Sequence, residues 1–167
     1  SVCMATYNGA KYIKEQLESI LCQLSEDDEV IVSDDGSTDG TIDIIMSYHD
    51  NRVKVLHHIS SPGSSFVKAT RNFENALLHA HGDYIFLADQ DDVWLPEKIE
   101  KTIQKQKETG ADLVFGDLEV VNEKLETIYP SFGDFMLLNR KINKYIGSYK
   151  VNYLEKDTNK VLSTQKV

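Results

Sequence analysis

Short apolar runs alternate with segments of helical periodicity along the first 115 residues of the chain. The runs at residues 1–5, 29–33, 53–57, 83–88 and 111–115 have the length and composition of buried strands. Between them, helical spacing of apolar residues begins at Tyr12 and recurs over residues 41–48, 66–80 and 96–108. Strands that alternate with helices of this length require right-handed crossovers and a mostly parallel sheet. We therefore expect a single α/β domain.

The length and charge of the chain exclude several classes of protein. At 167 residues it is long enough for one domain with a core and too short for two comfortable ones. Its formal net charge of −9 argues against general binding to nucleic acid or to an anionic membrane. The chain contains no apolar run near the ~20 residues of a membrane-spanning helix and no basic-then-apolar leader. We expect a cytoplasmic protein, at most peripherally associated with the inner face of the membrane.

The two cysteines also favour the cytoplasm, and the first residue bears on where the natural chain begins. Cys3 and Cys22 are too few for a disulfide framework and form no C-x-x-C pair, so we expect two buried thiols in a reducing compartment. Because Ser1 already lies in an apparent strand, we expect that the natural N-terminus has been trimmed.

Conspicuous polar sequences follow three of the predicted strands. They are Ala5-Thr6-Tyr7-Asn8, Ser33-Asp34-Asp35-Gly36-Ser37 and Asp89-Gln90-Asp91-Asp92. The carboxyl ends of parallel strands meet at one edge of the sheet, and ligands bind outside that edge. The sequence therefore predicts one site built from all three segments.

Two interpretations of the acidic residues 89–92 stay open at this level. Hard cations such as Mg²⁺ or Mn²⁺ prefer oxygen ligands, and a D-x-D pair leaves coordination positions for substrate phosphates. Alternatively, the acids form a solvated turn that caps the next helix, where negative charge suits the helix dipole. Asp92 alone could provide that cap, because Pro96 lies near the predicted helix start.

The other candidate side chains also have structural alternatives. Asp34 and Asp35 are typical of any strand-to-helix loop, but a carboxylate could also accept a hydrogen bond from the imide N–H of a pyrimidine base. Arg71 is either a surface arginine or a guanidinium that pairs with phosphate oxygens. Trp94 and Tyr7 are typical core or rim aromatics, although Tyr7 beside a strand end could stack on a base. We expect the histidines to be structural.

The ordered motifs resemble the inverting glycosyltransferase family 2, which has the Rossmann-like GT-A fold. The matching segments are CMATYNG (3–9), IVSDDGSTD (31–39), RNFENAL (71–77), GDYI (82–85) and LADQDDVWLP (87–96). The resemblance covers about residues 1–120 and implies a nucleotide-sugar-binding core there. Residues 121–167 would be the start of an acceptor-side segment or a disordered or incomplete tail.

The resemblance also implies roles for individual residues. The nucleotide-sugar-binding set would be Ala5, Thr6, Tyr7, Asn8, Asp34, Asp35, Arg71 and Asp89, and Asp91 with Asp89 would hold Mn²⁺ or Mg²⁺. Within that set, Asp35 would bind the base imide and Arg71 would approach the base and diphosphate. Asp91 would bind the metal, and Asp89 would lie towards the ribose or the metal.

The implied reaction transfers a sugar from a UDP- or dTDP-linked donor to the hydroxyl of a saccharide or lipid-linked saccharide, with inversion. The motif style is similar to bacterial enzymes of cell-surface polysaccharide synthesis. The reaction needs a general base, and the family places an acidic one in a later segment. After residue 122 only Asp134 and Asp157 remain as aspartates, and neither has a matching context. The base is therefore not assigned, and we expect the chain to stop short of the acceptor half.

Two rival functions are compatible with parts of the sequence. The chain could be a non-catalytic nucleotide-sugar-binding domain that lacks the base. Residues 89–93 also fit the D-x-D-x-[TV] pattern of haloacid-dehalogenase-like phosphatases, in which the first aspartate is a nucleophile. That motif normally follows the first strand of its domain, whereas three predicted strands precede it here.

Overall fold

The computed structural model describes residues 1–131, 151–154 and 161–164. The chain divides into two compact units, Ser1–Glu97 and Lys98–Val167. This division falls before the boundary at residue 120 that the motifs suggested, and the functional assignment of the two segments stays a prediction. Asp134 and Asp157 lie outside the described residues.

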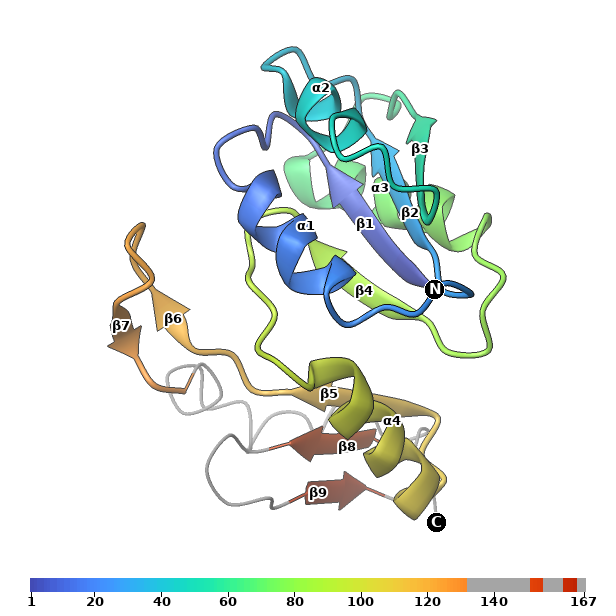
Figure 1. Ribbon diagram of the computed structural model, residues 1–167, viewed down its shortest axis with the longest axis vertical. Helices are drawn as coiled ribbons and strands as arrows, with labels where there is room; N and C mark the ends of the chain where they lie inside the picture. The colour runs from blue at the N-terminus through green and yellow to red at the C-terminus, as the bar shows by residue number, and fades with distance from the viewer. Residues whose placement is uncertain (132–150, 155–160, 165–167) are drawn as a thin grey trace. The chain divides into compact units, whose positions relative to one another are not determined.

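The first unit is built on a four-stranded parallel sheet in the order β3-β2-β1-β4 (Figure 1). Its strands are β1 (Val2–Thr6), β2 (Val30–Asp34), β3 (Val53–His57) and β4 (Phe86–Asp89). The register aligns Val2 with both Val30 and Phe86. Every crossover between these strands contains a helix, which confirms the parallel sheet predicted from the alternating pattern.

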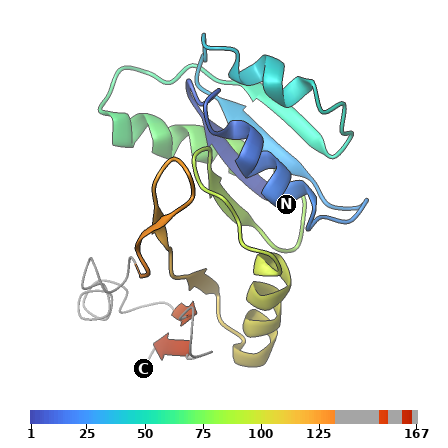
Figure 2. The same cartoon turned by 60° about the vertical axis from the view of Figure 1, so that its left-hand side comes forward.

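Three helices cover the two faces of this sheet. They are α1 (Ile13–Leu21), α2 (Thr41–Met46) and α3 (Ser65–Leu77). Figure 2 shows α1 in blue and α3 in green on opposite faces. Cys3 and Ile31 pack against Ala76 of α3, while Met4 is also fully buried although strand geometry points it to the other face. β1 and β2 are therefore apolar on both faces, as a parallel sheet covered by two helical layers requires.

Several element boundaries differ from the sequence prediction, among them the end of α3 and the start of β4. Helix α3 ends at Leu77, whereas the spacing of apolar residues predicted a helix as far as residue 80. A Cβ at Gly82 would lie 2.5 Å from the backbone nitrogen of Ser1, so this glycine permits a close approach of two chain segments. Strand β4 begins only at Phe86, where pairing with Val2 begins.

The second unit begins with α4 (Lys98–Thr109), and its described residues form two small sheets. Strands β5 (Leu113–Gly116), β8 (Val151–Leu154) and β9 (Val161–Thr164) form one sheet, and β6 (Val120–Val121) pairs with β7 (Thr127–Tyr129) in the other. In the β6–β7 hairpin, Leu125 adopts a φ of 59° and the Asn122 side chain accepts hydrogen bonds from the backbone of Lys124 and Glu126. Regular structure thus continues into the segment 121–167, beyond the last strand that the sequence pattern predicted. Of the helices that the structure describes, none is long and apolar enough to cross a membrane.

The cysteines match the prediction only in part. Cys3 is buried, and this burial raises the pKa of its thiol, whereas Cys22 is exposed after the end of α1. The expectation of two buried thiols is therefore wrong for Cys22, the C-cap residue of α1, which is exposed to solvent.

Candidate functional site

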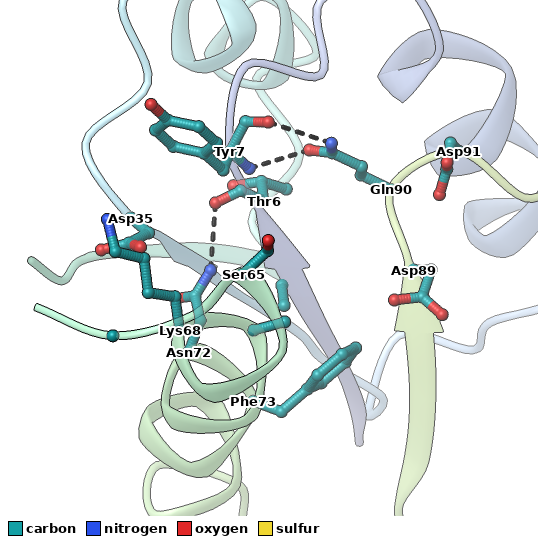
Figure 3. A pocket seen from close by; sticks show the side chains of 13 residues that line it. Thr6, Tyr7, Asp35, Ser65, Lys68, Asn72, Phe73, Asp89, Gln90 and Asp91 are labelled. Atoms are coloured by element: carbon teal, nitrogen blue, oxygen red, sulfur yellow. Dashed lines mark hydrogen bonds between the residues drawn. The ribbon is translucent and has the colours of Figure 1, made fainter. Parts of the chain in front are cut away.

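A pocket of about 460 Å³ opens at the carboxyl ends of β1, β2 and β4, beside the first turns of α3 (Figure 3). Its lining residues are Ala5, Thr6, Tyr7, Asp35, Gly63, Ser65, Lys68, Ala69, Asn72, Phe73, Asp89, Gln90 and Asp91. All of them belong to the first unit. The structure thus brings together the three polar strand ends, because parallel pairing places them at one edge.

The middle of the pocket is held by a hydrogen bond between β1 and α3. Asn72 Nδ2 donates to the carbonyl oxygen of Thr6 at 3.0 Å, and both residues are buried. The other amide atom, Asn72 Oδ1, is buried without a hydrogen-bond partner among the described residues. A buried acceptor of this kind is costly unless a water or a ligand donor satisfies it.

Asp34 and Asn8, two of the predicted binding residues, are used internally and do not line the pocket. Asp34 is only 2% exposed and accepts hydrogen bonds from Thr6 Oγ1 at 2.8 Å and from the Ser37 backbone N–H at 2.8 Å. Asn8 Oδ1 accepts from the backbone N–H of Thr38 at 2.8 Å. Both side chains therefore fix the loop after β2 against the end of β1.

Asp35 does line the pocket, on the side of β2. Its Oδ1 atom accepts a hydrogen bond from the backbone N–H of Ser60 at 2.5 Å, which fixes the orientation of the carboxylate. Its Oδ2 atom accepts no hydrogen bond from a described residue. Its own N–H donates to the Thr6 carbonyl oxygen at 2.9 Å, so the backbone of Thr6 receives bonds from both Asp35 and Asn72. The Asp35 carboxylate therefore has a fixed orientation, and its Oδ2 atom remains available to accept a hydrogen bond from a ligand.

Arg71, the cation predicted to approach a diphosphate, is exposed and does not line the pocket. Lys68 lines it instead. The pocket-facing residues of α3 occupy one stripe of the helix, and at 3.6 residues per turn Arg71 lies about 130° from the centre of that stripe. Asn72, which is buried against β1, fixes this rotation of the helix. Lys68 lies four residues before Asn72 and therefore on the same face of α3, so a helical projection centred on Asn72 would have predicted Lys68 as the pocket cation.

Asp89 and Asp91 both line the pocket, at the end of β4 and in the loop after it. Asp89 is exposed as a whole residue, but its carboxyl group is partly enclosed by protein. Burial raises the pKa of Asp89, and the neighbouring Asp91 carboxylate raises it further. Within the part of the chain that the structure describes, no lysine, arginine or histidine forms an ion pair with either residue. The pair therefore carries excess negative charge that a bound cation would offset.

The donor set fits a hard divalent cation shared with a phosphate ligand. The described residues contain no group of three or more His, Cys, Asp or Glu side chains that could hold a metal on their own. Two carboxylates plus ligand oxygens are what Mg²⁺ typically uses when it binds together with a nucleotide. Asp89 and Asp91 would be the residues of this chain that hold the metal.

Asp92 and Trp94, which follow the D-x-D segment, do not line the pocket. Helix α4 begins at Lys98, six residues after Asp92, and the interpretation that Asp92 caps this helix stays a prediction. The chain takes a turn at Pro96 and Glu97 before the helix, and Glu97 has a φ of 65°. Trp94 is 4% exposed and its ring packs against Phe86 with 5.8 Å between centroids, so it is a core aromatic. Tyr7, in contrast, is 57% exposed at the pocket.

Two glutamines that the sequence interpretation overlooked hold the D-x-D segment. Gln90 Oε1 accepts from the Tyr7 backbone N–H at 2.9 Å, and Gln90 Nε2 donates to the Tyr7 carbonyl oxygen at 3.0 Å. The buried Gln16 of α1 donates from Nε2 to the Asp89 carbonyl oxygen at 2.7 Å. Their partners are distant in sequence, so local patterns gave no signal for either contact.

The sequence of the chain is similar to a known protein family and to several curated proteins. The sequence profile described as glycosyl transferase family 2 matches residues 1–160. The chain is 32% identical to glycosyltransferase GlyG of Streptococcus pneumoniae over 160 residues, which is 91% of this chain and 52% of that protein. It is 34% identical over 131 residues to dTDP-rhamnosyl transferase RfbG of Shigella flexneri, which is 77% of this chain and 43% of that protein. The chain thus spans about half the length of the curated relatives it matches.

The fold is also similar to solved structures. The crystal structure of S. aureus TarS 1-349 in complex with UDP-GlcNAc matches with a TM-score of 0.63 at 30% identity, covering 72% of this chain and 34% of that one. This likeness confirms the GT-A fold that the motifs implied, with its mostly parallel sheet flanked by helices. Because the family profile covers nearly all of the sequence, this chain belongs to glycosyl transferase family 2.

Proposed function

We propose that this chain is the donor-binding part of an inverting, metal-dependent glycosyltransferase that uses a UDP- or dTDP-linked sugar. The observation that carries the proposal is the single pocket that joins Asp35, Thr6 and the Asp89–Asp91 pair. One end of this pocket offers a fixed carboxylate acceptor, and the other offers two unneutralised carboxylates. A pyrimidine nucleoside diphosphate presents an imide N–H and a metal-binding diphosphate, and it is complementary to both ends.

Each residue has a distinct part in this proposal. Asp35 accepts the imide N–H of the base through its Oδ2 atom, because Oδ1 is taken by Ser60. Tyr7, exposed at the same end of the pocket, stacks on the base. Lys68 lines the pocket on the side of Asp35 (Figure 3) and contributes a positive charge with which a bound diphosphate can pair, in place of the Arg71 that the motif suggested.

Asp91 and Asp89 hold Mn²⁺ or Mg²⁺, with Asp91 as the principal ligand and Asp89 towards the ribose or the metal. When bound, the cation offsets the charge that develops on the leaving nucleoside diphosphate. The protein's own contribution is to hold the two carboxyl groups close together at the strand end. The cost of that arrangement is visible in the raised pKa of Asp89.

The acceptor side rests on the names of relatives. The name of one relative, UDP-Glc:alpha-D-GlcNAc-diphosphoundecaprenol beta-1,3-glucosyltransferase, supports a saccharide or lipid-linked saccharide acceptor. The name of another, dTDP-rhamnosyl transferase, supports the nucleotide-sugar donor only. We propose that the whole protein acts in bacterial cell-surface polysaccharide synthesis, in the cytoplasm or at the inner face of the membrane. No general base is assigned among the described residues.

The test is a donor screen on the complete protein. Binding of UDP, dTDP and GDP is measured by calorimetry with Mn²⁺ and with EDTA, and hydrolysis of the matching nucleotide sugars is then followed. We expect UDP or dTDP to bind in the presence of Mn²⁺ and one matching sugar nucleotide to be hydrolysed slowly. If none of the three nucleotides binds, the donor assignment is wrong. Tight binding without any hydrolysis or transfer would favour the alternative of a non-catalytic nucleotide-sugar-binding domain.

The phosphatase alternative does not survive the family assignment. The D-x-D segment follows β4 and not the first strand, and the profile match places the chain in glycosyl transferase family 2. A generic phosphomonoester should therefore release no phosphate when incubated with the complete protein.

A further inference from the structure

We propose that Gln90, the middle residue of the D-x-D segment, is a positioning residue that couples nucleotide binding at Tyr7 to metal binding at Asp89 and Asp91. The inference rests on the proposed function and concerns how the two ends of the site communicate. Gln90 lies between the two carboxylates in sequence, but its side chain reaches to the end of β1 (Figure 3).

The contact between Gln90 and Tyr7 uses both ends of one side-chain amide. Gln90 Oε1 accepts from the Tyr7 N–H at 2.9 Å, and Nε2 donates to the Tyr7 carbonyl oxygen at 3.0 Å. These residues are 83 positions apart in the chain. Among side chains in their usual protonation states at neutral pH, the amides of asparagine and glutamine offer a donor and an acceptor side by side, and glutamine reaches further from the backbone. The two bonds fix the distance and the rotation of the loop relative to β1.

Gly9 makes room for this contact. A Cβ at position 9 would come within 2.3 Å of Gln90 Oε1 and 2.6 Å of its Cδ. The backbone of Gly9 is itself anchored, because its N–H donates to Thr41 Oγ1 at 2.8 Å and its carbonyl oxygen accepts from Tyr12 and Ile13. A side chain at position 9 would therefore displace the Gln90 amide, since the anchored backbone has little freedom to retreat.

A second amide holds the same loop from the opposite end. Gln16, fully buried in α1, donates from Nε2 to the Asp89 carbonyl oxygen at 2.7 Å, and its Oε1 accepts from Ser19 Oγ at 3.2 Å. The D-x-D backbone is thus tied to α1 at Asp89 and to β1 through Gln90. Asp91 follows immediately after Gln90, so its position depends on the bonds that Gln90 makes.

The contact at Tyr7 continues to the nucleotide end of the pocket. The carbonyl oxygen of Thr6, the residue before Tyr7, accepts a hydrogen bond from the backbone N–H of Asp35 at 2.9 Å. Base recognition at Asp35 and Tyr7 and metal binding at Asp89 and Asp91 therefore share one hydrogen-bonded frame that passes through Gln90. Two ligands that order the same frame bind with positive coupling, and the coupling is reciprocal.

The experiment measures this coupling in the complete protein. Calorimetry gives the affinity for UDP with and without Mn²⁺, the affinity for Mn²⁺ with and without UDP, and the affinity for uridine without metal. Gln90→Met keeps the length of the side chain and removes both hydrogen bonds. Gly9→Ala leaves the side chain intact and pushes its amide away from Tyr7. Gln104→Met, on the exposed surface of α4, is the matched control.

We expect Gln90→Met and Gly9→Ala each to lower the UDP–Mn²⁺ coupling factor by about fivefold or more, within the usual range of such couplings. Uridine affinity without metal and the melting temperature should stay close to wild type, and Gln104→Met should change nothing. The double variant should lose no more coupling than either single one, because both changes break the same contact.

Wild-type coupling in Gln90→Met would overturn the inference. So would a parallel loss of uridine, UDP and Mn²⁺ affinity together with a lower melting temperature, because that result describes a purely structural residue. If the wild-type protein binds neither UDP nor Mn²⁺, the proposed function itself fails, and the two failures are thereby distinguished.

Discussion

Asp34 and Asp35 are neighbours in the chain, yet their carboxyl groups serve different parts of the molecule. Asp34 is buried and accepts hydrogen bonds from Thr6 Oγ1 and from Ser37, which closes the loop after β2. Asp35 lines the pocket, with Oδ1 held by the Ser60 N–H. Successive residues at the end of a strand point to opposite sides, so one acid becomes structural and the other remains available to a ligand.

The matched variants Asp34→Asn and Asp35→Asn should separate these roles. Asp34→Asn replaces one buried acceptor by a donor and should lower the free energy of unfolding by about 1–3 kcal/mol. Asp35→Asn can keep its bond to Ser60 and should leave stability nearly unchanged, but it should weaken UDP binding roughly tenfold or more by losing a charged acceptor. Urea unfolding and calorimetry of the two variants give both quantities. Equal effects of the two variants on UDP affinity would contradict the division.

Asp91→Asn should remove the metal dependence of nucleotide binding. The substitution keeps the shape of the side chain and removes the charge that a divalent cation needs. We expect the UDP affinity of the variant in Mn²⁺ to equal the affinity of the wild type in EDTA. Asp92→Asn changes charge one residue further along, outside the pocket lining, and serves as the control. An Mn²⁺ effect that persists in Asp91→Asn, or that Asp92→Asn removes equally, would argue against Asp91 as the metal ligand.

Lys68→Met and Arg71→Met test which cation of α3 faces the donor. The structure lines the pocket with Lys68 and leaves Arg71 on another face of the helix. Lys68→Met should weaken UDP binding by roughly tenfold through the loss of a charge-assisted contact, and it should weaken uridine binding far less. Arg71→Met should have little effect on either ligand. The reverse order of the two effects would restore the assignment made from the motif.

The loss of folding stability at acid pH should depend in part on the ionisation of Asp50. The side-chain hydrogen bonds from Arg52 lower the pKa of Asp50 from 3.8 to about 2, and the Arg52 Nη1 atom also donates to the Leu24 carbonyl oxygen after α1. A carboxyl whose pKa is depressed on folding stabilises the folded state above its unfolded pKa and loses this contribution as pH falls. The contribution should therefore disappear between about pH 4 and pH 2.

Urea unfolding of the wild type and Asp50→Asn across this interval checks the sign. The difference in unfolding free energy between the two proteins should be largest above pH 4 and should shrink towards pH 2. Asp83→Asn, in the exposed turn before β4, is the control for a general charge effect. A difference that stays constant from pH 2 to pH 5 would show that the pair does not act through the ionisation of Asp50.

Several features of the site followed from sequence because they depend on chain order alone. Thr6, Asp35 and Asp89 each end or follow a strand of a parallel sheet, and parallel pairing leaves only one edge for such residues. Other features depended on the rotation of a helix or the direction of a side chain. The choice of Lys68 over Arg71 required the contact of Asn72 with Thr6, which joins residues 66 positions apart.

The sequence by itself determined that this chain forms a parallel α/β sheet and gathers its polar strand ends, because the period of apolar residues is a local property of the chain. Only the tertiary structure decided what each polar side chain does there. The Gln90–Tyr7 and Gln16–Asp89 bonds join segments that are 83 and 73 residues apart. Such bonds form only after the apolar faces have packed and fixed the register, so no local pattern contains them.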